Sequence, residues 1–96
     1  MQINITNEAE VHIVNAIKFY ELQKIGLGKY FLDTIYSDIE SLQIYCGIHI
    51  KIKNYHRLLS KRFPYAIYYK YNEHNIYIYA VLDCRSNPTF LNNLLK

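Results

Sequence analysis

The chain has 96 residues, of which 51% are hydrophobic and 20% are charged, which is typical of one small globular domain and excludes an intrinsically disordered chain. No apolar run approaches the roughly 18 residues that a membrane span needs, and the N-terminus lacks the basic start and apolar core of a signal peptide, so we expect a cytoplasmic protein without membrane contact. The net charge of +3 is uneven, with three Lys against six Asp or Glu in residues 1–47 and eight Lys or Arg against two acidic residues in 48–96. This asymmetry indicates either an anionic partner on one side of the domain or an uneven solvated surface.

The N-terminal half predicts a strand followed by two helices. Alternation over residues 2–6 predicts an edge strand, and Asn7 with Glu10 three residues later is a variant of a capping box. We therefore expect a helix over about residues 8–25 and, after the glycines at 26 and 28, a second helix over about 28–45. The spacing of the apolar residues gives each helix one apolar face, made of Ala9, Ile13, Ala16, Ile17 and Tyr20 in the first and of Phe31, Ile35, Ile39 and Leu42 in the second.

After Gly47 the periodicity changes to that of strands. Residues 48–52 alternate apolar and basic or polar, with a kink or bulge expected at 54–56. Two runs rich in tyrosine, residues 62–71 and 75–82, are separated by a short polar break and predict a β-hairpin. Strict alternation in the second run would place Ile76, Ile78, Ala80 and Leu82 on one face, and Pro88 predicts a short C-terminal helix.

These elements predict a single α+β domain over residues 1–96. In it, an N-terminal helical hairpin packs on one face of a small, mostly antiparallel sheet, and a short helix ends the chain. The hairpin is apolar on both faces, so its second face needs a further segment, a partner or water to cover it.

Motifs of familiar enzymes are absent from the sequence. It has no Gly-rich phosphate loop, HExxH, CxxC or GxSxG motif, and the four histidines lie at no metal-ligand spacing. Cys46 and Cys84 are expected to be reduced core residues. We therefore expect neither a metal nor a cofactor.

Basic and aromatic residues are interleaved between positions 51 and 85. Such a set suits a nucleic acid or an acidic protein; the alternative is that the tyrosines are core residues and that the cations protect an edge strand from aggregation. His56, beside Arg57, is a candidate proton donor or phosphate ligand because the ordinary pKa of histidine is near neutrality. The set consists of Lys51, Lys53, Tyr55, His56, Arg57, Lys61, Arg62, Tyr65, Tyr68, Tyr69 and Arg85.

The order of several motifs resembles the RelE/ParE toxin superfamily. The stretch from Arg62 to Tyr69 (RFPYAIYY) is the most specific of them, and the resemblance spans about residues 3–90. It is carried further by Ala16, Phe19-Tyr20-Glu21, Leu27-Gly28, Phe31-Leu32, Arg57, Val81-Leu82, Arg85 and Pro88.

The resemblance implies the toxin of a type II toxin–antitoxin pair, used for plasmid stabilisation and growth inhibition and neutralised by a cognate antitoxin. Members similar to ParE inhibit DNA gyrase by binding it, and the hairpin is more similar to theirs. Members similar to RelE cleave mRNA on the ribosome without a metal, which would give catalytic roles to Lys51, Lys53, Arg62 and Arg85. A degenerate, non-toxic member that only binds a partner is a third interpretation.

Two departures from the RelE pattern favour the ParE-like interpretation. The arginine expected early in the hairpin is replaced by Tyr65 or Ala66, and the C-terminal aromatic residue is Phe90, which has no hydroxyl group. We expect the surface for the antitoxin or the target to contain His56, Arg57, Lys61, Tyr65, Tyr68, Tyr69 and Phe90.

Overall fold

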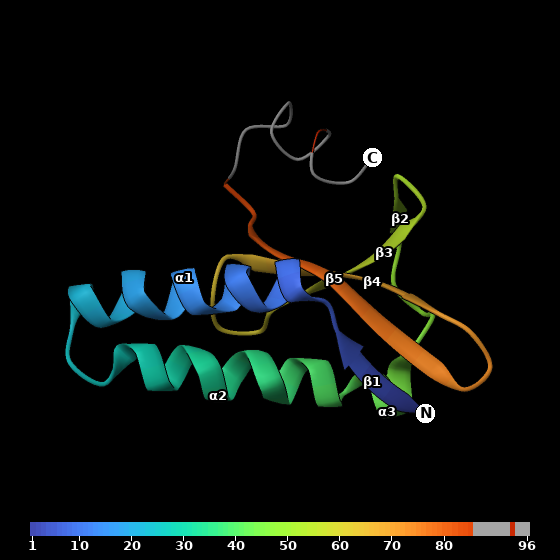
Figure 1. Ribbon diagram of the computed structural model, residues 1–96, viewed down its shortest axis with the longest axis horizontal. Helices are drawn as coiled ribbons and strands as arrows, with labels where there is room; N and C mark the ends of the chain where they lie inside the picture. Colours follow the sequence, from blue (N-terminus) through green and yellow to red (C-terminus); the bar gives the residue numbers. More distant parts are fainter. Residues whose placement is uncertain (86–92, 94–96) are drawn as a thin grey trace.

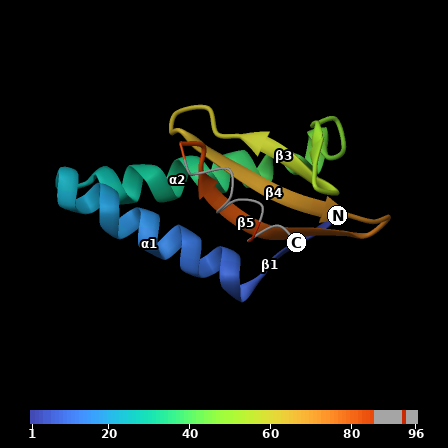
Figure 2. The same ribbon diagram turned by 90° about the horizontal axis from the view of Figure 1, so that it is seen from above.

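Three helices and one five-stranded sheet make up the part of the chain that the structure describes, residues 1–85 and 93 (Figures 1 and 2). In this computed structural model the strand order is β1-β5-β4-β3-β2, with β1 parallel to β5 and the other neighbours antiparallel. The α+β class and the mostly antiparallel sheet are therefore confirmed, whereas the predicted C-terminal helix, with Pro88 and Phe90, lies outside the described residues. The strands are β1 (Gln2–Ile5), β2 (Lys51–Ile52), β3 (Tyr55–Leu59), β4 (Tyr65–Tyr71) and β5 (Asn75–Asp83).

Helix α1 (Asn7–Gln23) begins one residue earlier than the sequence predicted. Thr6, and not Asn7, is the N-cap, because its side-chain oxygen accepts a hydrogen bond from the backbone N–H of Ala9. The following turn is fixed by Glu21, whose carboxylate accepts hydrogen bonds from the backbone N–H groups of Gly26 and Gly28. Gly26 has a φ of 89°, in the left-handed region that glycine adopts without strain.

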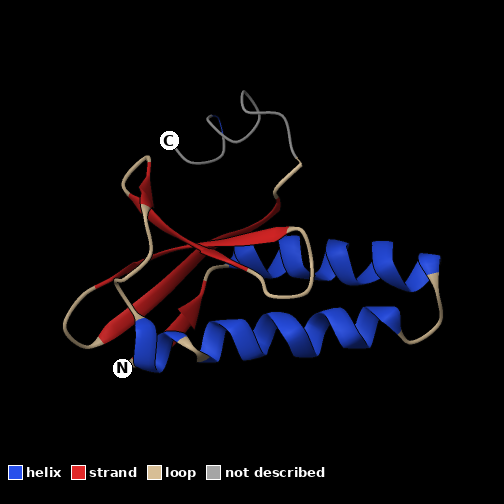
Figure 3. Cartoon of the chain, turned by 180° about the vertical axis from the view of Figure 1, so that it is seen from behind, coloured by secondary structure: helices blue, strands red, loops and turns tan. Residues whose placement is uncertain are grey.

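The predicted second helix is interrupted and forms α2 (Leu27–Glu40) and α3 (Leu42–Tyr45). The interruption falls at Ser41, whose hydroxyl donates to the backbone carbonyl of Asp38 in the last turn of α2. α1 and α2 lie side by side on one side of the sheet (Figures 1 and 3). Close approach of the two helices depends on Gly28, where a Cβ atom would lie 2.8 Å from the carbonyl oxygen of Ile17.

The main core lies between the helices and the sheet. The expected apolar faces of both helices are buried in it, and the sheet contributes buried residues from β4 and β5, with residues of β1 and β3 packed against them. These core side chains are Ala9, Ile13, Ala16, Tyr20, Phe31, Ile35, Ile39, Leu42, Tyr65, Ile67, Tyr69, Ile76, Ile78 and Val81, with Ile3, Ile5, Ile17 and Leu58 packed against them.

A second, short hairpin precedes the tyrosine-rich one, and the sequence predicted only its first strand. β2 and β3 are joined by Lys53 and Asn54, both with positive φ (54° and 70°), as a type I′ turn requires. The kink expected at residues 54–56 is therefore a tight turn. The strand expected over residues 48–52 is limited to two residues.

A β-bulge in β5 overturns the expected strict alternation of that strand. Tyr68 pairs with Ala80 and the next residue, Tyr69, pairs with Ile78, so Tyr79 is the extra residue. Beyond Tyr79 the two faces are exchanged. Val81 consequently joins the main core, whereas Ala80 and Leu82 point to the opposite face.

Within residues 1–85 and 93, no helix is long and apolar enough to cross a membrane.

Candidate functional site

The sheet face opposite the main core carries a second cluster, which we call the second face. Ala66, Tyr68, Ala80 and Leu82 are buried there, and Tyr55 packs against them. No residue of α1, α2 or α3 belongs to this cluster. The second face is therefore the side of the sheet away from the helices, built by β3, β4 and β5.

Arg57 and Tyr68 lie side by side on the second face, because they are paired across β3 and β4. Burial raises the pKa of Tyr68, and the nearby guanidinium of Arg57 offsets part of that rise. The Nε atom of Arg57 is buried, and no group of the described residues accepts a hydrogen bond from it. A buried donor without a partner costs about 1–3 kcal/mol, so a bound carboxylate, phosphate or carbonyl would relieve this cost.

Lys70 extends the second face toward the β4–β5 turn. Its Nζ atom lies 4.5 Å from the ring centroid of Tyr55 and 5.8 Å from that of Tyr79. The two rings meet edge to face at 5.4 Å. Cation–π contacts of this kind hold a charged group in one place and leave its N–H donors available.

Arg85 follows the end of β5, near Tyr20 and Tyr65 of the main core, and is ion-paired with Asp83. Its Nη2 atom is 2.7 Å from Oδ2 of Asp83, and its Nε atom donates to Oδ1 at 2.9 Å. This hydrogen bonding lowers the pKa of Asp83. The arginine is exposed, so it can exchange Asp83 for another anion.

Three residues predicted for the site face the main core and not the second face. Tyr65 is buried against Tyr20 and Phe31, and burial raises its pKa to about 12. Tyr69 is fully buried, and its hydroxyl accepts from the Gly47 N–H at 3.0 Å. His56 is 9% exposed, stacks on Tyr69 and contacts the His49 carbonyl through Nδ1 at 2.8 Å.

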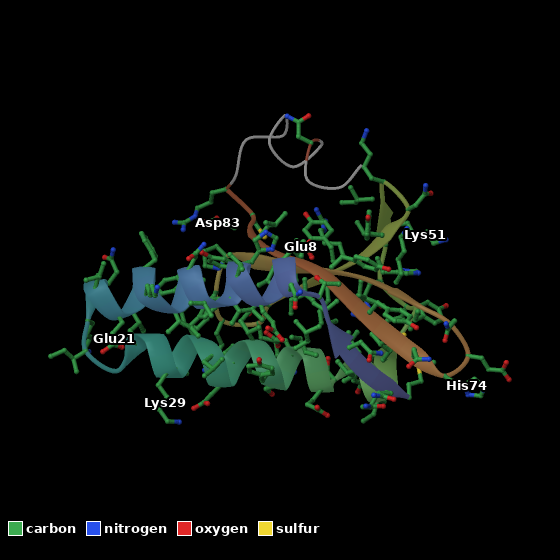
Figure 4. The ribbon with its side chains drawn as sticks, viewed as in Figure 1. Glu8, Glu21, Lys29, Lys51, His74 and Asp83 are labelled. Carbon is green, nitrogen blue, oxygen red and sulfur yellow. The ribbon has the colours of Figure 1, made fainter. Side chains whose placement is uncertain are left out.

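The remaining predicted residues divide between two ends of the sheet. Lys61 and Arg62 lie in the β3–β4 loop beside α2, where Arg62 donates to the Tyr30 hydroxyl at 3.1 Å. Lys51 and Lys53 belong to the β2–β3 hairpin. In Figure 4, Lys51 and Asp83, the partner of Arg85, are well separated. The four cations that a nuclease would use are therefore not gathered around one point.

Sequence reasoning missed Lys70 and Tyr79 as members of this surface. The alternation of β4 was a usable signal for Lys70, because it places this residue on the face of Tyr68. Tyr79 could not be found in this way, because only the bulge turns its ring toward Tyr55.

Side chains that could bind a metal ion do not cluster in the described part of the chain. Residues 1–85 and 93 contain no group of three or more His, Cys, Asp or Glu side chains placed to hold a metal ion. Arginine, lysine and tyrosine dominate the second face, and these groups bind anions and apolar surfaces by hydrogen bonding and packing.

No protein-family model matches the sequence, and no curated protein matches it significantly. Among solved structures, the fold is similar to that of a chain of the chromosomal ParDE TA system from P. aeruginosa, with a TM-score of 0.68. The two chains share 16% sequence identity, and the match covers 84% of this chain and 92% of the other. The chain thus has the fold that the resemblance to RelE/ParE toxins implied.

Proposed function

We propose that this chain is the toxin of a type II toxin–antitoxin module, that a cognate antitoxin neutralises it, and that it acts in the cytoplasm by binding DNA gyrase. The likeness of fold to a chain of a ParDE system supports the toxin–antitoxin assignment. The whole of residues 1–96 would form the toxin domain.

The observation that carries the protein-binding mechanism is the composition of the second face. Its centre combines apolar side chains, tyrosine rings and one arginine with a buried unpartnered Nε atom. Tyrosine and arginine are enriched in protein interfaces and often supply most of the binding energy. An acidic or carbonyl-rich segment of the antitoxin or of gyrase would complete the hydrogen bonding of Arg57.

The distribution of the cations gives less support to RNA cleavage. A cleavage site needs its cations around one scissile phosphate, whereas Lys51 and Lys53 belong to the β2–β3 hairpin and Arg62 and Arg85 lie just before β4 and just after β5. In addition, Tyr65 and Tyr69 are buried in the main core and cannot transfer protons to a substrate on the second face.

A ribosome-dependent mRNA endonuclease is the second candidate function. The observation that favours it is the pairing of Lys51 with His56 across β2 and β3, which places a cation beside a group able to transfer a proton. A degenerate member that binds its partner without toxicity is the third.

Expression in bacteria tests the proposal. Induction of the chain alone should arrest growth, and co-expression of the neighbouring gene product should restore it. Unimpaired growth with folded protein present would leave only the non-toxic interpretation.

Purified protein then separates the two mechanisms. We expect inhibition of DNA supercoiling by gyrase, lost in Arg57→Leu and retained in Lys18→Leu, a matched removal of one charge on the exposed surface of α1. Message cleavage on translating ribosomes that disappears in Arg85→Ala, without any effect on supercoiling, would instead establish the endonuclease.

A further inference from the structure

The solvent side of helix α1 carries a second set of aligned apolar side chains, opposite the set that is buried in the main core. At roughly 3.6 residues per turn, its members lie about half a turn away from Ala9, Ile13 and Ala16 of the core. Because α1 lies at one margin of the molecule, this side of the helix faces away from the sheet (Figure 2). We call this set the outer stripe; it consists of Val11, Val14 and Leu22, with Asn15 and Lys18 between them.

The apolar residues of the outer stripe are well exposed. Val11 is 56% exposed, Val14 46% and Leu22 88%. Single exposed apolar side chains are normal, but these three lie in line on one helix face, as residues three, four or eight positions apart do. Valine is also a weaker helix former than leucine, lysine or glutamate, so two valines on the solvent side of a helix indicate a packing surface. A pocket of about 460 Å³, to which both valines contribute, opens beside them and offers space for an apolar side chain.

The charges along α1 indicate what packs there. Glu8 and Glu10 lie in the first turn of the helix, whereas Lys24 is its C-cap. Two copies of α1 packed in parallel would bring like charges and like ends of the helix dipole together. Packed antiparallel, they would place Lys24 of each copy beside Glu8 and Glu10 of the other, and the two dipoles would also be favourably aligned. The surface of α1 is therefore complementary in charge to itself, as a two-fold interface requires.

The apolar residues of the outer stripe match in the same antiparallel arrangement. If the two-fold axis passes midway between Val11 and Leu22, Val11 of each copy lies opposite Leu22 of the other. Leu22 would then enter the pocket beside Val11 and Val14 of the other copy. Lys18 lies near the axis, where its long side chain can extend along the interface and keep its ammonium group in water.

We propose that two copies of the chain form a weak antiparallel dimer through their outer stripes. One pair of helices buries less than the roughly 1,600 Å² of a standard stable interface, so we expect a dissociation constant in the micromolar range. The outer stripe and the second face lie on opposite sides of the molecule. The dimer therefore leaves both second faces open and can hold two partner chains at once. It does not depend on the choice of toxin target and would form in a non-toxic chain as well.

Sedimentation equilibrium of the full chain, from micromolar to millimolar concentration, tests the proposal. We expect a monomer–dimer equilibrium that Leu22→Ser weakens at least about tenfold, because it removes the side chain that fills the pocket of the other copy. The matched control is Ile44→Ser on α3, which removes an apolar side chain that is 79% exposed and should change the affinity less than about twofold. Both side chains are exposed, so both variants should fold.

Exchange of charges tests the antiparallel orientation. Glu10→Lys and Lys24→Glu should each weaken self-association about tenfold, because both symmetry-related pairs then become repulsive. An equimolar mixture of the two variants should associate about as tightly as the wild type, since residues 10 and 24 of facing copies then carry opposite charges again.

Three results would overturn the proposal. A chain that stays monomeric up to millimolar concentration would leave the outer stripe to another segment of this chain or to a helix of a partner protein. Dimerisation that Leu22→Ser does not weaken more than Ile44→Ser would place the interface elsewhere. A mixture of the two charge variants that associates no more tightly than either variant alone would exclude antiparallel pairing of α1.

Discussion

Substitution of His12 should destabilise the fold through a hydrogen bond that links helix α1 to strand β5. Strand β1 ends at Ile5, opposite Ile78, so it offers no partner to the backbone N–H of Val81 further along β5. The Nδ1 atom of His12 accepts this hydrogen bond instead, at 3.2 Å. Val81 is 1% exposed, so water cannot replace the lost acceptor.

The size of the effect follows from the burial of this N–H group. In His12→Ala an unpaired buried donor remains, which costs about 1–3 kcal/mol of unfolding free energy. A loss of about 2 kcal/mol would lower the melting temperature of a domain of this length by about 8–16 °C. His12→Asn is the matched control, because its side-chain oxygen lies near the position of Nδ1 and retains an acceptor.

The same contact gives the stability a defined dependence on pH. Burial lowers the pKa of His12 below 6.5, and Glu8 offsets only part of this shift. The unfolded chain therefore binds a proton more readily than the folded one, so this contribution to stability is complete above pH 6.5 and is lost as the pH falls toward the folded-state pKa. Replacement of His12 by Asn should remove this part of the pH dependence.

Urea unfolding followed by circular dichroism at neutral and mildly acidic pH measures both effects. The expected order of stability at neutral pH is wild type, then His12→Asn, then His12→Ala. If His12→Ala is as stable as His12→Asn, the backbone of β5 has another partner and the reasoning is wrong.

Three further variants test other parts of the structure. Arg57→Leu should keep or raise the melting temperature, because it removes a buried unpartnered donor, while growth inhibition is lost; a large drop in melting temperature would contradict this. Gly28→Ala should lower the unfolding free energy by about 1–3 kcal/mol, measured in urea, since the new Cβ atom would approach the Ile17 carbonyl; wild-type stability would show that the helices separate at no cost. Arg85→Ala should raise the pKa of Asp83, measured by NMR titration, but change the stability by less than about 1 kcal/mol, because the ion pair is partly exposed. An unchanged pKa would exclude Arg85 as its cause.

Most of the fold could be predicted because its elements follow simple periodicities. The spacing of Ile13, Phe31 and Ile35 identified the buried helix faces, and the β4–β5 hairpin followed from two apolar runs with one polar break. The second hairpin was harder, since a two-residue strand has no periodicity. Its type I′ turn also uses Lys53-Asn54 where the strongest sequence signal would be Asn-Gly.

The candidate site could be predicted only in part, because the sequence does not state which face of a strand points to the helices. Arg57 and Tyr68 were expected and lie together on the second face. Tyr65, Tyr69 and His56 are polar aromatic residues, as Tyr68 is, but their side chains point to the opposite side of the sheet. Which side a strand residue faces is decided by where the helices pack. The bulge at Tyr79 depends on how two strands pair, and such long-range geometry has no local signature.

The parallel pairing of β1 with β5 has a consequence for synthesis of the protein. Gln2 pairs with Asn75, so the first strand made must wait for the last strand before the sheet can close. Closing a loop of about 70 residues is slow compared with the formation of a helix or a local hairpin. During translation, α1 and α2 therefore emerge before any sheet exists to cover their apolar faces. The second face, which contains Arg57 and Tyr68, is complete only after nearly the whole described chain has left the ribosome. A nascent chain thus cannot present the proposed surface before β5 has been made.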